Sequence, residues 1–170
     1  GDMTTADWDR DYHDDAVYFG SIDTSEANLS GALLRFKVGI NIENSFVNTL
    51  LSTGQPVSAA PLTLTDKNNY WIYSGTGRLL VNNDNKSASV NSFYGVKEPK
   101  NSNGVHTFST VSRESLVDTS NVVVKTSGQV LLQSMGVDSP VMIAGRSVDS
   151  FDVLKMEMDK QPGWKIDLTT

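Results

Sequence analysis

The chain has 170 residues, of which 38% are hydrophobic, so it is long enough to enclose a sizeable core within one domain. Its net charge of -6 and pI of about 4.8 exclude the basic surface that binds a phosphate backbone, and we expect no nucleic-acid partner. The absence of cysteine excludes disulfides and thiolate chemistry, and no apolar stretch approaches the length of a membrane span.

An acidic stretch occupies residues 7–15, near the start of the chain. Five aspartates occur among its nine residues, and four of them stand at the first, third, fifth and ninth places. Ca²⁺ takes six to eight oxygen ligands, which acids at alternate positions of a tight turn supply together with a backbone carbonyl at the seventh place. The spacing therefore predicts a calcium site, with His13 contributing its backbone oxygen. The predicted ligands are Asp7, Asp9, Asp11, His13 and Asp15.

This loop differs from a helix-loop-helix calcium site in two places. Tyr12 stands at the sixth place, where an EF-hand carries glycine, and Tyr18 stands at the twelfth, where it carries a bidentate glutamate. A solvated acidic run is the alternative interpretation. Because the residues that follow are strand-like, we expect Asp15 to supply the last carboxylate, as in calcium loops inserted between two strands of a β-propeller blade.

Short strand signals recur along the chain. They are rich in β-branched and aromatic residues and are bounded by Gly, Asn, Asp or Ser. The predicted strands are 16–19, 32–38, 70–73, 78–81, 93–96, 122–125 and 129–133, with turns at 82–85 and 100–104. These signals predict a mainly β protein.

Helical periodicity is confined to two segments. Residues 149–160 place Phe151, Leu154 and Met158 on one apolar face, and Pro162-Gly163 follows as a stop signal. Residues 113–118 favour a further helical turn. We therefore expect one or two short helices.

A weak internal repeat relates two pairs of predicted strands. Residues 17–20 followed by 31–36 resemble 72–75 followed by 91–96. Four-stranded repeats of about 40 to 50 residues are typical of propeller blades, and four to eight blades close a ring. The sequence therefore predicts a partial β-propeller of about three to four blades, with residues 1–170 forming a single domain or a fragment of a larger propeller.

Six short motifs follow the acidic stretch in order. They are Tyr-x-Gly at 18–20, Gly-x-Leu-x-Arg-Phe at 31–36, Gln-Pro-x-x-x-x-Pro at 55–61, Gly-Thr-Gly-Arg at 75–78, Ser-Phe-Tyr-Gly at 92–95 and Gly-Trp-x-x-Asp-Leu at 163–168. In this order they resemble the C-terminal β-propeller of the PilC/PilY family of type IV pilus tip adhesins and biogenesis proteins. The chain departs from the family at Tyr12 and Leu79, and residues 97–161 resemble it less.

The resemblance implies a non-enzymatic, calcium-binding segment of a bacterial surface protein. The implied location is the pilus tip, or the outer membrane or periplasm. The implied partners are pilus subunits or minor pilins and a host or abiotic surface.

Two alternatives remain open. One is an integrin-like, calcium-stapled blade repeat of a secreted binding protein, which would carry several such loops. The other is a quinoprotein dehydrogenase propeller, suggested by Trp8, Trp71 and Trp164. Neither histidine stands in a catalytic context and no nucleophile elbow is present, so we predict no catalytic residues and no organic cofactor.

Overall fold

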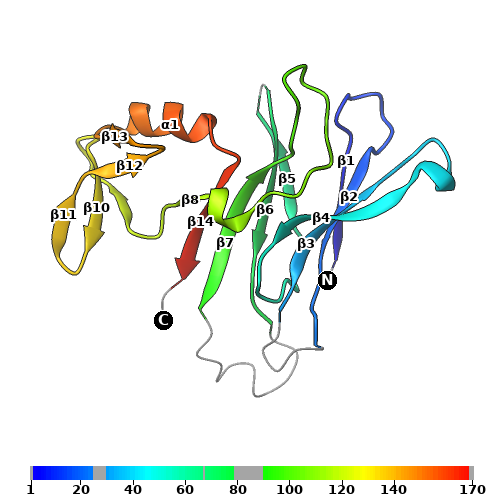
Figure 1. The fold of residues 1–170 in the computed structure, drawn as a ribbon, viewed down its shortest axis with the longest axis horizontal. Helices are drawn as coiled ribbons and strands as arrows, with labels where there is room; N and C mark the ends of the chain where they lie inside the picture. The colour runs from blue at the N-terminus through cyan, green and yellow to red at the C-terminus, as the bar shows by residue number, and fades with distance from the viewer. Residues whose placement is uncertain (1, 25–29, 67, 79–89, 169–170) are drawn as a thin grey trace.

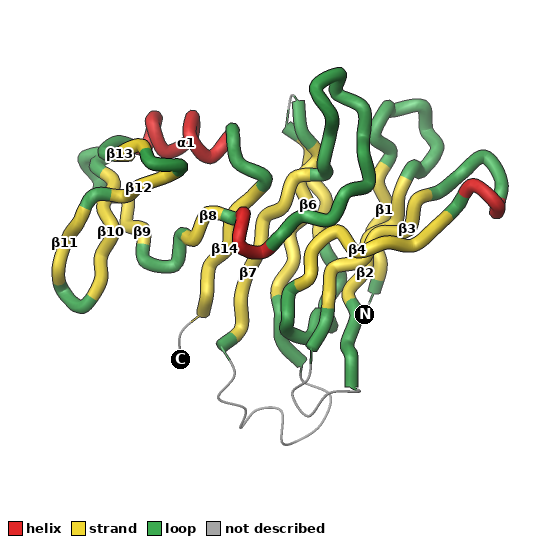
Figure 2. Tube along the Cα trace, viewed as in Figure 1, coloured by secondary structure: helices red, strands yellow, loops and turns green. Residues whose placement is uncertain are grey.

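The computed structural model describes residues 2–24, 30–66, 68–78 and 90–168. These residues form several antiparallel sheets and one short α-helix, which confirms the mainly β prediction (Figure 1). Two larger sheets share a core, and a smaller unit lies beside the second of them (Figure 2). Among the described residues, no helix has the length and hydropathy needed to cross a lipid bilayer.

The first sheet is a four-stranded antiparallel meander in chain order. Its strands are β1 (Met3–Ala6), β2 (Ala16–Gly20), β3 (Ala32–Lys37) and β4 (Phe46–Ser52), with the short 3₁₀ turn η1 (Ile42–Asn44) before β4. The predicted strands at 16–19 and 32–38 are confirmed. Strands β1 and β4 carry no alternating apolar pattern, and the sequence did not predict them.

The second sheet has five strands in the order β5-β6-β7-β14-β8. They are β5 (Leu62–Thr65), β6 (Tyr70–Gly75), β7 (Asn91–Lys97), β14 (Gly163–Leu168) and β8 (Val117–Asp118), of which only the β14–β8 pair is parallel. The predicted strands at 70–73 and 93–96 are confirmed. The predicted strand at 78–81, apart from its first residue, and the predicted turn at 82–85 lie outside the described residues.

A small unit is inserted between β8 and β14. It contains β9 (Val122–Val124), β10 (Val130–Ser134), β11 (Val137–Ser139), β12 (Val141–Ile143), β13 (Arg146–Val148) and α1 (Phe151–Asp159). Its own buried cluster consists of Val130, Val141, Ile143 and Val148. The predicted strands at 122–125 and 129–133 and the predicted helix at 149–160 are confirmed. The helical turn predicted at 113–118 is shorter, because only η3 (Arg113–Ser115) is helical and the chain then enters β8.

The predicted apolar face of α1 is wrong at one position. Leu154 and Met158 pack on the small cluster, whereas the Phe151 residue is 46% exposed and Lys155 lies over its ring. Phe151 is the first residue of the helix. Lys155 lies one turn further along, which is the spacing at which helical side chains meet.

The main core lies between the two larger sheets. Side chains of alternate residues on each strand point inward. The fully buried ones include Tyr18, Leu33, Leu51, Ile72, Tyr94 and Val96. The two larger sheets therefore pack through one face each.

The predicted repeat falls on corresponding places of the two larger sheets. Residues 17–20 and 31–36 belong to the neighbouring strands β2 and β3, and residues 72–75 and 91–96 belong to the neighbouring strands β6 and β7. The described residues contain two such sheets and the inserted unit. The predicted count of three to four successive blades is therefore wrong for these residues, because residues 98–162 add only β8 to the second sheet and otherwise form a connection and the inserted unit, without a further four-stranded repeat.

A buried ion pair crosses this core. Arg35 on β3 and Glu98, just after β7, are 63 residues apart in sequence, and both side chains are fully buried. Their guanidinium and carboxylate groups contact each other directly, and the Tyr18 hydroxyl donates to the second carboxylate oxygen at 2.7 Å. Burial raises the pKa of Glu98, while Arg35 and Tyr18 act to lower it. The pair ties the first sheet to the end of β7.

We expect Glu98→Gln to lower the free energy of unfolding by about 3–5 kcal/mol, because it leaves the buried Arg35 without its counter-charge. Urea unfolding followed by tryptophan fluorescence measures this loss. Asp138→Asn is the control, because the Lys125–Asp138 pair is exposed and such pairs contribute about 0–1 kcal/mol. A loss below about 1 kcal/mol in Glu98→Gln would show that the pair does not hold the sheets together.

Candidate metal centre

The acidic stretch forms the connection between β1 and β2. The two strands pair up to Ala6 and Ala16, and the Asp15 amide donates to the Ala6 carbonyl at 2.8 Å. On the other side, the Val38 amide donates to the Asp15 carbonyl at 2.8 Å. The loop therefore starts and ends at fixed points of the first sheet.

Three of the predicted ligands come together. One carboxylate oxygen from each of Asp7, Asp9 and Asp15 lies within 4.8 Å of the others. Calcium binds oxygens at about 2.3–2.6 Å, so two oxygens on one ion are separated by at most about 5 Å. The three carboxylates are thus close enough to share one cation.

The other two predicted ligands lie differently. The Asp11 carboxylate is not part of the close group and instead accepts from the His13 amide at 2.8 Å. The His13 imidazole is 86% exposed and lies 3.5 Å from the Asp11 carboxylate. Asp11 and the backbone oxygen of His13 remain predicted ligands.

The backbone of the loop turns through left-handed conformations at two residues other than glycine. Tyr12 has φ of 72° and Arg10 has φ of 64°. Tyr12 occupies the sixth place of the loop, where an EF-hand uses glycine for a sharp turn. The chain therefore keeps a glycine-like conformation at this place without the residue that favours it. The Tyr12 residue is 98% exposed, so no packing opposes the turn.

Backbone amides converge on the first aspartate. The Asp7 carboxylate accepts from the amides of Arg10 at 2.6 Å, Tyr12 at 2.9 Å and Asp11 at 3.2 Å. Desolvation raises the pKa of Asp7, but these amides outweigh it and hold that pKa below its usual value. Asp7 is thus held in its charged form, with its position fixed by the turn.

Asp9 shows the opposite effect. Its pKa is raised, first by desolvation and then by the negative charges of Asp11, Asp15 and Asp7. Within the described part of the chain, neither Asp9 nor its two close partners forms an ion pair with lysine or arginine. The carboxylates therefore repel one another without a protein cation to compensate, and a bound divalent cation would remove this repulsion.

Trp8 anchors the loop to the core. Its backbone amide donates to the Asp15 carboxylate at 2.5 Å, and its indole nitrogen donates to the Tyr18 hydroxyl at 3.2 Å. Its ring stacks on His106 with centroids 4.1 Å apart. From the second sheet, the Tyr70 hydroxyl donates to the Asp7 carbonyl. Both larger sheets therefore hold the loop.

Sequence reasoning missed these supporting residues. His106 pairs with Lys100 in an isolated bridge, and its ring covers Trp8. Tyr70 lies 63 positions from the loop residue that it contacts. No local pattern around these two residues signals such long-range contacts.

The donor set fits a hard divalent cation. Carboxylate and carbonyl oxygens are the ligands that Ca²⁺ prefers, and nitrogen or sulfur donors are not needed. Asp7, Asp9 and Asp15 would supply three carboxylates, and the remaining positions are open to Asp11, the His13 carbonyl and water. In comparisons with known proteins, the chain matches no protein-family model, no curated protein and no solved structure.

His106 makes folding sensitive to acid. Burial lowers its pKa to about 4, helped by the positive charges of Lys100 and Arg35. As the pH falls from 6.5, the ordinary value, towards 4, the unfolded chain takes up a proton that the folded chain does not, so stability decreases. We expect His106→Phe, which keeps an aromatic ring against Trp8, to lose less stability across this interval than the parent chain.

Thermal unfolding of both chains at pH values from 7 to 4 measures the difference. Protonation of the loop carboxylates affects both chains alike, so it cancels in the comparison. Parallel stability curves would contradict the assigned role of His106.

Proposed function

We propose that this chain is a non-enzymatic, calcium-binding β-propeller segment of a type IV pilus tip-associated adhesin or pilus biogenesis protein. Calcium orders the loop at 7–15 and thereby supports pilus function and surface attachment. The observation that carries the calcium part is the convergence of Asp7, Asp9 and Asp15 at a turn between two strands. Asp11 and the His13 carbonyl complete the proposed ligand set.

The arrangement of the two larger sheets supports the propeller part. Tyr18 on β2 and Tyr73 on β6 occupy the same place in the repeat, two residues before Gly20 and Gly75. Tyr18 points from the first sheet towards the second. Tyr73 lies on the far side of the second sheet, which is the face that points away from the first sheet, whereas its neighbour Ile72 is buried on the near side. In a ring of blades, equivalent side chains all point the same way around the axis, and the directions of these two tyrosines support that interpretation.

The far side of the second sheet supports the same interpretation. An antiparallel sheet that faces water on one side usually carries polar residues there. Here that side carries Leu62, Leu64, Trp71, Tyr73, Phe93 and Trp164, and the rings of Tyr73 and Phe93 lie 6.1 and 5.9 Å from that of Trp164. A sheet that is apolar on both sides suits a blade that lies between two others.

The ordered motifs that resemble the pilus family contact one another. The Thr76 hydroxyl of Gly-Thr-Gly-Arg donates to the Gln55 side chain of Gln-Pro at 2.8 Å and accepts from the Ser92 amide of Ser-Phe-Tyr-Gly at 2.7 Å. The Ser92 hydroxyl in turn donates to Asp167 of Gly-Trp-x-x-Asp-Leu at 2.6 Å. Four motifs thus form one hydrogen-bonded chain, which supports treating them as a single structural signature.

Gly95 and Trp164 link two of these motifs by packing. A Cβ atom at Gly95 would lie 2.6 Å from the Trp164 ring, closer than side chains approach. Glycine at this place therefore lets the tryptophan lie flat on β7.

The integrin-like alternative differs in the number of calcium loops, and the described residues contain one close group of three acids.

Calcium titration by calorimetry tests the metal site. We expect saturable binding, at about 10⁻⁴ to 10⁻³ M as in other extracellular modules. The folded chain should gain about 2.7 kcal/mol when free calcium reaches 100 times Kd. Asp9→Asn and Asp15→Asn should weaken binding at least about tenfold, since each removes a negative oxygen donor.

Asp14→Asn is the matched control, because Asp14 lies in the same loop but outside the close group of carboxylates. It changes net charge by the same amount and should leave the affinity nearly unchanged. Equal weakening by Asp14→Asn and Asp9→Asn would indicate general attraction of cations to an acidic surface and would contradict the ligand assignment.

Localisation tests the pilus part. In the bacterium that encodes the chain, immunogold labelling with antibodies against it should mark pilus tips. The label should leave the cell surface in a strain that lacks the major pilin. Labelling that is independent of the pilin would contradict the pilus assignment even if calcium binds.

A further inference from the structure

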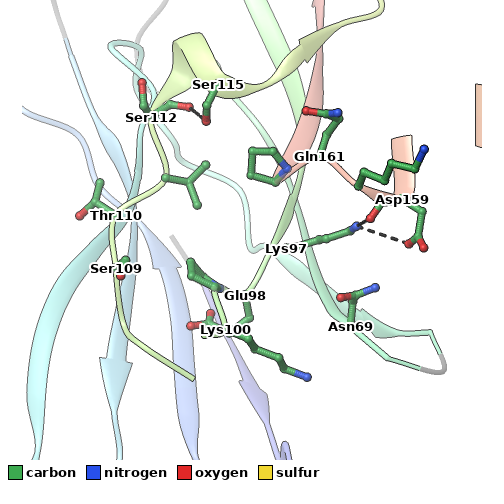
Figure 3. Close-up of a pocket in the computed structure, with 14 residues that line it drawn as sticks. Asn69, Lys97, Glu98, Lys100, Ser109, Thr110, Ser112, Ser115, Asp159 and Gln161 are labelled. Atoms are coloured by element: carbon green, nitrogen blue, oxygen red, sulfur yellow. Dashed lines mark hydrogen bonds and ion pairs between the residues drawn. The ribbon is translucent and has the colours of Figure 1, made fainter. Parts of the chain in front are cut away.

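A polar groove lies where three segments meet, away from the acidic loop. Its walls come from the end of β7 and the residues after it (97–100), from residues 109–112 and Ser115, and from the end of α1 and the turn after it (159–162), with Asn69 at one end. Its volume is about 500 Å³, within the range of about 300–1,000 Å³ of small-molecule sites. Figure 3 shows Ser112 and Ser115 at one end of the groove and Lys100 and Asn69 at the other.

The groove concentrates positive charge on an acidic protein. Three lysines line it, namely Lys97, Lys100 and Lys160, against two acids, Glu98 and Asp159. Glu98 directs both oxygens into the core, to Arg35 and Tyr18, so it is not available to a ligand. The local charge is therefore opposite in sign to the net charge of -6.

Two of the lysines already have carboxylate partners. The Lys97 ammonium is 3.4 Å from Asp159, and the Lys160 ammonium is 2.7 Å from Glu157. The Lys100 ammonium donates only to the Asn68 carbonyl, at 2.9 Å, and pairs with no carboxylate in the described part of the chain. The groove thus offers one ammonium group with open capacity for an anion.

The opposite wall carries a row of hydroxyl groups. These belong to Ser109, Thr110, Ser112 and Ser115. All four hydroxyls already form a hydrogen bond. Ser109 bonds with the Thr107 hydroxyl at 2.9 Å, Thr110 and Ser115 donate to backbone carbonyls at 2.8 and 2.7 Å, and Ser112 donates to the Glu114 carboxylate. Each oxygen therefore offers a ligand its remaining capacity to accept a hydrogen bond. The Gln161 side chain forms no hydrogen bond with another described residue, so both its donors and its acceptor are available. The groove therefore offers hydrogen-bonding groups on its serine and threonine wall and at Gln161.

We propose that this groove binds a sugar acid, with its carboxylate on Lys100 and its hydroxyls along the serine and threonine wall and Gln161. A single open ammonium suits one carboxylate better than a polyphosphate. The distributed hydroxyl and amide groups suit a polyol better than a small inorganic anion, which would use one point of the groove only. This site is separate from the calcium loop and goes beyond the proposed pilus function.

Calorimetric titration of the full chain in the presence of calcium tests the proposal with three ligands. D-glucuronate carries both features, D-glucose lacks the carboxylate, and acetate lacks the hydroxyls. We expect saturable binding of D-glucuronate, and affinities at least about tenfold lower for D-glucose and for acetate. A tenfold change corresponds to about 1.4 kcal/mol.

Two substitutions assign the site. Lys100→Met keeps the length of an exposed side chain and should weaken D-glucuronate binding about tenfold, and Gln161→Leu should weaken it less. Lys125→Met is the matched control, because Lys125 is also an exposed lysine but pairs with Asp138 in the inserted unit. It should bind D-glucuronate as the parent chain does.

Each contrary result overturns the proposal. These results are D-glucuronate heats that do not saturate, an affinity for acetate or D-glucose equal to that for D-glucuronate, and unchanged binding in Lys100→Met. Urea unfolding of each variant shows that it is folded. If Lys100→Met does not fold, Gln161→Leu decides, since its failure to weaken binding also overturns the proposal.

Discussion

The ion pair between Arg35 and Glu98 is the constraint that the described fold depends on. Removing two charges from water is costly, and their attraction compensates only when the remaining polar atoms are also satisfied. Tyr18 supplies a hydroxyl to Glu98, Asn48 accepts from the guanidinium at 3.1 Å, and the Phe108 ring lies 5.0 Å from the guanidinium carbon. These partners come from the first sheet and from the loop after β7, while the Nη2 atom of Arg35 is buried without a hydrogen-bond partner among the described residues.

The acidic loop is connected to that pair through short contacts. Trp8 bonds to Tyr18, which bonds to Glu98, and the backbone of Trp8 bonds to Asp15. The position of the loop carboxylates is therefore set by the core and not only by the local turn. A core that fixes the carboxylates in place lowers the ordering cost of binding a cation. In the same way, a cation bound to the folded chain adds to the stability of the core by mass action.

Elements with a local signature could be predicted from the sequence. Strands β2, β3, β6 and β7 are compact apolar runs, and α1 has a helical period with a stop signal. Strand β4 has no such local signature. A register shift opposite Leu33 and Leu34 lets the consecutive residues Leu50 and Leu51 both be buried, so buried and exposed residues do not alternate along this strand. Arg35 and Glu98 belong to residue types that are rarely buried, and only their long-range pairing makes them core residues.

The same limit applies to the proposed metal site. Spacing along the chain identified the acidic loop and named five ligands, but spacing does not determine which way a side chain turns. Asp11 is directed to the His13 amide, while Asp15, four positions later, reaches back over the loop to the Trp8 amide. Closure of the β1–β2 pair brings Asp15 beside Asp7 and Asp9, and that closure is a property of the sheet.

One segment, residues 98–112, contacts both the acidic loop and the polar groove. Lys100 lines the groove and pairs with His106, and His106 stacks on Trp8, which holds Asp15. The loop and one wall of the groove are therefore linked by three consecutive contacts. Any coupling between a cation at the loop and a sugar acid in the groove must be reciprocal, since each ligand then changes the affinity for the other by the same factor.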